Sequence, residues 1–160
     1  MIIYHGGTDI VKTPRIIKAY TGRDFGIGFY TTDIREQAVK WAGRQARYRR
    51  KDKAVLNIYE LEDTAFRVLS VKRFDGYVME WLDFVVGNRS NVSLRHEYDL
   101  VIGKVANDDV GETVQAVVDG LMPKDFALTR LAFMQAHNQI CLSTDRALSY
   151  LSFVSAERVN

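Results

Sequence analysis

The chain has 160 residues, 47% of them hydrophobic, which is the size of one domain and enough apolar side chains for a buried core. Its net charge of +2 at pH 7 indicates no particular partner, and its one cysteine, Cys141, excludes an intramolecular disulfide and argues against a cysteine-ligated zinc site. No signal-peptide pattern and no apolar run of roughly 18 residues is present. We therefore expect one domain over residues 1–160, in the cytoplasm and away from membranes.

The first third of the chain predicts two short strands followed by a helix. Strands are expected over residues 2–6, IIYHG, and 28–32, GFYTT, where β-favouring residues are bounded by turn residues. Asp33 and Glu36 have the spacing of a capping box, which predicts the start of the helix. The helical spacing that follows predicts a buried face made of Ala38, Trp41, Ala42 and Gln45.

The rest of the chain predicts a mixture of both element types. Further strands are expected over residues 54–62, 65–71, 98–106, 138–144 and 151–159. Helices are expected over residues 74–88, 111–119 and 123–136, with a helical turn around Ala147. Asn107, Asp108 and Asp109 predict a turn and a helix cap. Because strands and helices do not alternate regularly, the pattern predicts an α+β fold with a largely antiparallel β core and flanking helices.

The segment from residue 35 to residue 53 is strongly basic. It carries eight basic and two acidic residues, a local excess of six positive charges. Such a helix face is often no more than a solvated surface. It is also the kind of surface that binds phosphates or an acidic partner, and the sequence leaves both interpretations open.

Residues 25–32, FGIGFYTT, place Gly26 and Gly28 inside a run of aromatic and β-favouring residues. Glycine weakens a strand, so the pair indicates that the backbone approaches either a ligand or a neighbouring strand closely. The segment lacks the third glycine of a dinucleotide-binding turn and the Gly-Lys-Ser/Thr ending of a P-loop. Neither of these phosphate-binding motifs is therefore present.

Several segments together resemble the ADP-ribosyltransferase superfamily. They are YHGGT at residues 4–8, DFGIGFYTT at 24–32 with the helical QAVKWA after it, WLDFVVGNR, YDLVIGKVANDD and HNQICLSTDRALSYLSF. The chain is similar to the branch with a His-Tyr-Glu site, which includes diphtheria toxin and the poly(ADP-ribose) polymerases. Within that branch it looks like small bacterial domains thought to be toxins of toxin–antitoxin modules. The resemblance implies a split β core, NAD as co-substrate, a macromolecular acceptor and a small antitoxin partner.

Carried over to this sequence, the resemblance implies a role for each matching residue. His5 would bond a ribose hydroxyl of NAD, and the main chain of Gly6 would hold the nicotinamide carboxamide. Tyr30 would stack on the nicotinamide ring, and Gly26 and Gly28 would let the backbone bend around it. The remaining residues implied to line the NAD site are Tyr4, Thr8, Phe25 and Phe29.

The third catalytic position departs from the superfamily pattern. The usual residue is a glutamate at the start of a late strand, and the matching residue here is Gln139. Glutamine keeps a hydrogen-bond acceptor but lacks the negative charge that stabilises an oxocarbenium-like sugar. Either catalysis is slow, or another carboxylate such as Glu60 or Asp108 supplies the charge, or the protein binds NAD without turning it over.

Two functional hypotheses follow from different classes of protein. In the first, the protein is a transferase that cleaves the nicotinamide–ribose bond of NAD and moves ADP-ribose to a protein, a nucleic acid or water. In the second, it is a non-catalytic module that binds NAD, ADP-ribose or RNA and uses the basic helix after residue 35. The release of nicotinamide distinguishes them.

Overall fold

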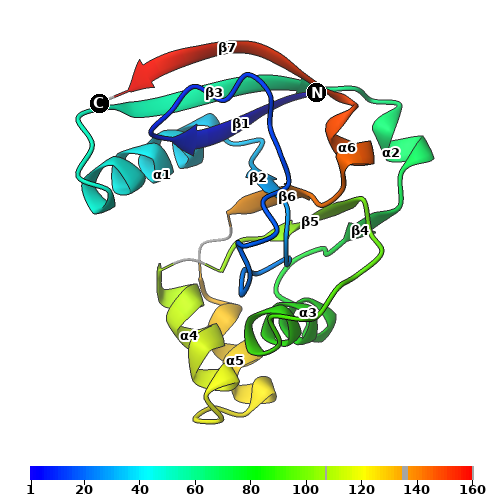
Figure 1. Cartoon of the computed structure of the whole chain (residues 1–160). Coiled ribbons are helices and arrows are strands. Elements are labelled where there is room, and N and C mark those ends of the chain that lie inside the picture. The colour runs from blue at the N-terminus through cyan, green and yellow to red at the C-terminus, as the bar shows by residue number, and fades with distance from the viewer. Residues whose placement is uncertain (107, 135–136, 160) are drawn as a thin grey trace.

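The computed structural model describes residues 1–106, 108–134 and 137–159. Figure 1 shows the helices and strands in chain order. Their bounds are β1 Ile2–Gly7, β2 Phe29–Thr31, α1 Arg35–Tyr48, β3 Ala54–Leu61, α2 Ala65–Val68, β4 Val71–Arg73, α3 Met79–Ser90, β5 Leu100–Lys104, α4 Asp108–Val118, α5 Lys124–Leu131, β6 Asn138–Leu142, α6 Asp145–Leu148 and β7 Leu151–Val159.

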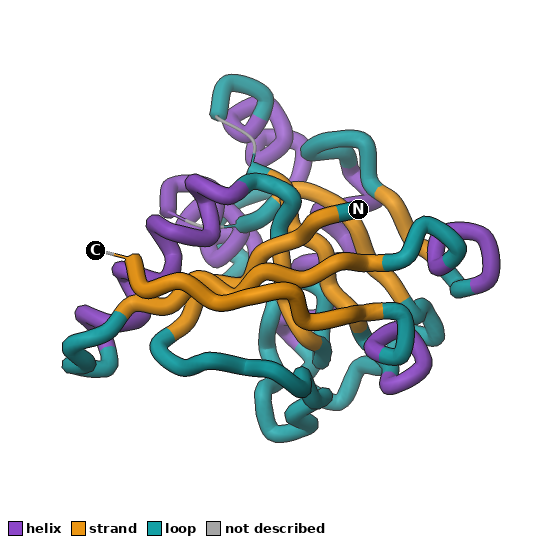
Figure 2. Tube along the Cα trace, turned by 90° about the horizontal axis from the view of Figure 1, so that it is seen from above, coloured by secondary structure: helices purple, strands orange, loops and turns teal. Residues whose placement is uncertain are grey.

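The strands form two sheets, and the fold is α+β as the sequence predicts. One sheet has the order β1-β3-β7, and both of its pairings are antiparallel (Figure 1). Figure 2 shows strands lying side by side when the molecule is seen from above. The other has the order β2-β6-β5-β4, in which only β4 and β5 run parallel. Among the described residues, one isolated antiparallel bridge, between Tyr4 and Thr32, links the two sheets.

The four-stranded sheet is covered on both faces, which explains why β6 is apolar at successive positions. Alternate side chains of a strand point to opposite faces. Cys141 packs into a core cluster with Trp81 of α3, whereas Ile140 and Leu142 pack into a second cluster with Ile3 of the other sheet. The sheet therefore lies between the three-stranded sheet and the layer of α3, α4 and α5 (Figure 1).

Helix α1 packs against β1, and its buried face differs from the predicted one. The buried residues are Ala38, Ala42 and Ala46, while the Trp41 side chain is 45% exposed and Gln45 is only half-buried. The cause is the close approach of β1: a Cβ atom on Gly6 would lie 2.1 Å from the carbonyl oxygen of Ala38. Only small side chains fit on the helix face that meets such a strand.

The predicted capping box at Asp33 and Glu36 is wrong. Ile34 is the N-cap residue of α1 and its side chain makes no cap. The hydroxyl of Thr32 instead accepts a hydrogen bond from the Ile34 amide (3.1 Å), and Asp33 accepts one from the Asn138 side chain (3.3 Å). Asp33 therefore bonds a residue of β6 and does not cap the helix.

Three other predicted elements differ from the structure. The strand expected over residues 65–71 is the short helix α2 followed by β4, because Ala65 and Leu69 are buried one helical turn apart. The helix expected from residue 111 begins at Asp108, and Asn107 lies outside the described residues. The helix expected over 123–136 ends at Leu131 and is followed by a turn, while residues 135 and 136 lie outside the described part.

The other predicted elements are confirmed to within a few residues: β1, β2, β3, β5, β6, the turn at α6, and β7. The helix α3 is also confirmed, but it begins at Met79 rather than at residue 74. Within the described residues, no helix combines the length and apolar character that crossing a membrane requires.

Candidate functional site

The candidate site lies where β1 and β2 separate, just past the bridge between Tyr4 and Thr32. This place, where the two sheets meet, is here named the junction. The amide and carbonyl of Tyr4 bond the main chain of Thr32 at 2.8 and 2.9 Å. Because main-chain groups alternate along a strand, the N–H and C=O of Gly6 face the same edge as those of Tyr4. Gly6 is buried, and no described residue pairs with it on that side. This edge therefore offers one donor and one acceptor side by side.

His5 lies beside this edge and is joined to β2. Its Nδ1 is 2.7 Å from the Tyr30 carbonyl oxygen, so Nδ1 carries the proton and donates. The imidazole also packs on Phe29, with 4.6 Å between the ring centroids. Burial lowers the pKa of His5, the bond to Tyr30 opposes this change, and the positive charges of Arg23 and Arg49 add to it. His5 is therefore a neutral imidazole whose Nε2 is an acceptor.

The Tyr30 phenol holds in place the segment that contains Gly26 and Gly28, here named the glycine motif. Its hydroxyl donates to the Gly26 carbonyl (2.6 Å) and accepts from the Phe25 amide (3.1 Å). Burial raises the pKa of Tyr30 well above its ordinary value, so the phenol stays protonated. The guanidinium of Arg23 lies 5.3 Å from the centroid of the Tyr30 ring. The main chain of Tyr30 thus meets His5, while its side chain braces the turn before β2.

The two glycines of this motif have separate structural causes. Gly26 has φ of +76°, a left-handed conformation that favours glycine. A Cβ atom on Gly28 would lie 2.3 Å from the Cys141 sulfur and 2.7 Å from the Leu142 carbonyl oxygen. Of the two explanations that the sequence left open, a neighbouring strand accounts for Gly28.

Gln139 lies on β6 one residue beyond the last β2–β6 pair. That pair is Thr31 with Ile140, so the register continued by one residue sets Gln139 opposite Thr32. The side chain is only 9% exposed, and its buried Nε2 has no partner among the described residues. An unpaired buried polar group costs about 1–3 kcal/mol, so this donor is available to a partner that the described residues do not supply.

Gln37 of α1 presents a second unpaired atom next to Gln139. Its Nε2 donates to the main-chain oxygen of Asn138 (2.7 Å), which fixes the orientation of the amide. Its Oε1 is buried and has no partner within the described part of the chain. Sequence reasoning did not identify Gln37, because a lone glutamine on a helix carries no signal.

The two alternative carboxylates, Glu60 and Asp108, differ in their surroundings. Glu60 pairs with Ile2, three positions along the ladder from the pair of His5 and Asn57, which is roughly 10 Å. Asp108 is bound by Arg44 through both carboxylate oxygens, at 2.7 and 2.9 Å. The positive charge of Arg44 therefore offsets the negative charge of Asp108.

The remaining residues implied by the resemblance fall into two groups. Tyr4 and Phe29 lie at the junction with His5, and Thr8 is buried at the end of β1 with its hydroxyl on Asp9 (2.8 Å). The Phe25 ring is fully buried in the cluster under α3, so only its main chain faces the glycine turn.

Two anchors of the glycine motif, His96 and Asp24, were given no role by the sequence analysis. His96 donates from Nε2 to the Phe25 carbonyl (2.9 Å) and accepts at Nδ1 from the Tyr98 amide (3.3 Å). Asp24 bonds Arg89 and the amide of Ala106 (2.9 Å). These contacts fix the main chain on the N-terminal side of Gly26.

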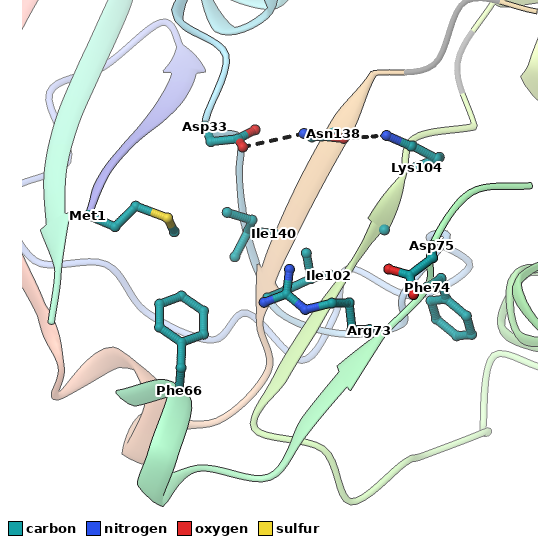
Figure 3. Close-up of a pocket in the computed structure, with 11 residues that line it drawn as sticks. Met1, Asp33, Phe66, Arg73, Phe74, Asp75, Ile102, Lys104, Asn138 and Ile140 are labelled. Carbon is teal, nitrogen blue, oxygen red and sulfur yellow. Dashed lines mark hydrogen bonds between the residues drawn. The ribbon is translucent and has the colours of Figure 1, made fainter. Parts of the chain in front are cut away.

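A cleft of about 320 Å³ lies on the other face of β6 (Figure 3). Its lining includes Met1, Phe66, Arg73 and the network in which Asn138 bonds both Asp33 and Lys104. Successive residues of a strand point to opposite faces, so Asn138 faces the cleft and Gln139 faces away from it. The cleft adjoins the candidate site without including the unpaired amide of Gln139.

The fold and site define an α+β protein with a polar, partly unsatisfied junction between two sheets. The chain belongs to the family described as Protein of unknown function (DUF3990), whose family model matches residues 1–153. No curated protein and no solved structure matches the chain. The family description assigns no activity, so a functional conclusion depends on the chemistry of the site.

Proposed function

We propose that the protein is an NAD-dependent ADP-ribosyltransferase that cleaves the nicotinamide–ribose bond and transfers ADP-ribose to a protein or nucleic-acid acceptor. The observation that carries the proposal is the unpaired edge of Gly6. A carboxamide has one N–H donor group and one carbonyl acceptor, which match a free strand edge as a neighbouring strand would. Nicotinamide carries such a group next to its reacting bond.

The neighbouring side chains suit a sugar with hydroxyl groups. The neutral His5 accepts at Nε2 from one ribose hydroxyl, and the unpaired Nε2 of Gln139 donates to another. Tyr30, held by Gly26, would provide an aromatic surface for the nicotinamide ring. Of these contacts, the one to Gln139 would satisfy a buried atom that has no partner among the described residues.

The reaction needs little proton transfer. The bond between the nicotinamide nitrogen and the ribose C1′ breaks, and its electron pair neutralises the pyridinium, so nicotinamide leaves uncharged. The oxocarbenium-like sugar is then attacked by an acceptor nucleophile or water, which loses its proton to solvent. A site with neutral His5, Tyr30 and Gln139 is sufficient for this chemistry, although the missing carboxylate makes it slow.

The proposal is tested by mixing purified protein with NAD and measuring free nicotinamide by chromatography, alongside calorimetric binding. We expect His5→Ala and Gln139→Ala each to lower release by about 10- to 1,000-fold, the typical effect of losing one positioned contact. Gln115→Ala is the matched control, because this exposed glutamine bonds only Asp119. Release that is equal in all of these variants would refute the assignment of the site.

The second candidate function is a module that binds NAD, ADP-ribose or RNA without turnover. It is favoured by the neutral Gln139 at the position of the superfamily's glutamate. Calorimetric binding of NAD with no nicotinamide release over a day would support it. Absence of any NAD or ADP-ribose binding would contradict both the transferase and a nucleotide-binding module.

The resemblance to bacterial toxins extends the proposal to the cell. Expression from an inducible promoter in a bacterial host should arrest growth, and a small antitoxin encoded nearby should relieve the arrest. His5→Ala should also relieve it at an equal protein level. If His5→Ala is equally toxic, the toxicity does not arise from this site.

A further inference from the structure

The C-terminal end of α1 and the strands beside it form a basic surface, here named the basic end. Its six cations are Arg47, Arg49, Arg50, Lys51, Lys53 and Arg158. Each of the five on α1 and the following turn is exposed, and Asp52 is the one acidic residue among them. Val55 pairs with Arg158 in the β3–β7 ladder, which brings the last cation to the same end of the sheet (Figure 1).

The charges of the basic end are not compensated by neighbouring carboxylates. Of the eight basic residues between 35 and 53, Arg35 pairs with Glu157 and Arg44 pairs with Asp108. No cation of the basic end has an ion-pair partner within residues 1–106, 108–134 and 137–159. Arg158 bonds only the main-chain oxygen of Asp52 (3.1 Å).

Tyr48 gives this surface an aromatic ring. It is the last residue of α1 and is 86% exposed, so it packs on almost nothing. Cations near a helix C-terminus are favoured by the helix dipole within the last turn. That effect explains one or two of the arginines, but it explains neither six cations nor an exposed tyrosine among them.

The basic end adjoins the candidate site. Strand β1 runs toward it, because Gly7 pairs with Val55, and Val55 also pairs with Arg158. His5 lies two residues before Gly7, and Arg49 is near enough to contribute to the lowered pKa of His5. A polymer bound along the basic end would therefore pass next to the junction of the two sheets.

We propose that the basic end binds single-stranded nucleic acid, with its cations on the phosphates and the Tyr48 ring stacked on a base. Proteins that hold single strands combine a cationic track with exposed aromatic rings, and the rings add affinity that salt does not remove. An acidic protein would use the cations but has no comparable use for Tyr48. Among acceptors for the proposed transferase, this surface favours a nucleic acid, although binding itself does not depend on that activity.

The test is fluorescence anisotropy with labelled 12-nucleotide single-stranded RNA and DNA and a 12-base-pair duplex, over a salt series and without NAD. Arg50→Gln/Lys51→Gln/Lys53→Gln should weaken single-strand binding and reduce the slope of log K against log salt by about two, since each lost phosphate contact removes about 0.7. The control, Lys18→Gln/Arg67→Gln/Arg130→Gln, removes three exposed cations elsewhere and should leave the slope unchanged.

The stacking contact is tested with Tyr48→Ala. We expect single-strand affinity to fall by about 5- to 150-fold with the salt slope retained, the effect of losing one stacked base. Phe133→Ala removes an equally exposed ring, 89% accessible, outside the basic end and should have no effect. All of these positions are exposed, and thermal melts verify that each variant folds.

Several results would overturn the inference. They are the absence of saturable binding in low salt, equal losses in the two triple variants, an unchanged affinity in Tyr48→Ala, and displacement of the oligonucleotide by polyglutamate as effectively as by unlabelled RNA. The last result would indicate an acidic protein partner instead. Because no NAD is present, none of them bears on the proposed NAD chemistry, and a lack of nicotinamide release leaves nucleic-acid binding intact.

Discussion

The ion pair of Asp24 and Arg89 should be the costliest polar contact to break in this protein. The Arg89 Nη2 lies 2.7 Å from Asp24 Oδ1, and Nε donates to the same oxygen at 2.9 Å. Nη2 also donates to the carbonyl of Ala106, and Nη1 donates to that of Gly111. The second carboxylate oxygen accepts the Ala106 amide at 2.9 Å. The pair therefore ties the glycine motif to α3, to the end of β5 and to α4.

The expected magnitude follows from burial. The Asp24 and Arg89 side chains are 10% and 17% exposed, so water screens them little. Removing one partner leaves the other charge buried and unpaired, which costs about 3–5 kcal/mol. Asp24→Ala and Arg89→Ala should each lower the free energy of unfolding by that amount. The double variant should lose less than the sum, because the second removal relieves the unpaired charge.

The measurement is urea unfolding followed by the fluorescence of the buried Trp81. The control is Lys124→Ala, which breaks an ion pair with Asp83 whose side chains are 45% and 52% exposed and should cost less than about 1 kcal/mol. Strictly additive losses in the double variant, or a loss in Asp24→Ala no larger than in the control, would refute the reasoning.

Three further predictions concern single residues. Burial lowers the pKa of His5, so the imidazole of the unfolded state takes up a proton at a higher pH than that of the folded state. The free energy of unfolding should therefore fall as the pH drops below about 6.5. Urea unfolding from pH 8 to pH 5 should show a smaller fall in His5→Gln. Burial raises the pKa of Cys141 to about 12, so a thiol reagent at pH 8 should label it only when the protein unfolds, and labelling of folded protein would contradict its burial. Gly28→Ala should lower the melting temperature because its Cβ would overlap the Cys141 sulfur, whereas Gly43→Ala, which meets nothing within 4 Å on α1, should raise it.

Most of the strands were predictable from the sequence because their signals are local. Residues 2–6 and 138–144 show β-favouring runs bounded by turn residues, and the structure confirms both. The helix face of α1 was not predictable, because the preference for Ala46 over Trp41 depends on how closely Gly6 of a distant strand approaches. The prediction of a strand in place of the short helix α2 was wrong for a related reason. The apolar residues of α2 have a strand-like composition, and only their burial in the folded protein selects the helix.

The candidate site was predictable only in part. The resemblance selected His5, Tyr30 and Gln139, which the fold brings to the junction of β1, β2 and β6. The resemblance also selected the main chain of Gly6, but Gln37 was not identifiable, because the sequence does not show which polar atoms remain unpaired after folding. Such groups are identified only when the fold shows which polar atoms have hydrogen-bond partners.

The neutral side chain at position 139 fits its surroundings before any ligand binds. Its buried Nε2 has no partner among the described residues, and the neighbouring buried atom of Gln37 is an acceptor. A glutamate there would be desolvated without a donor, so burial would raise its pKa and favour the protonated form. Gln139→Glu should therefore cost little stability below pH 4 and progressively more as the pH rises through the raised pKa.

NAD should reverse this loss of stability in Gln139→Glu, because its nicotinamide ring carries a positive charge and its ribose supplies hydroxyl donors. The thermal shift produced by NAD at pH 8 should accordingly be larger for Gln139→Glu than for the parent chain. An equal shift in the two proteins would mean that position 139 does not face the nicotinamide ribose.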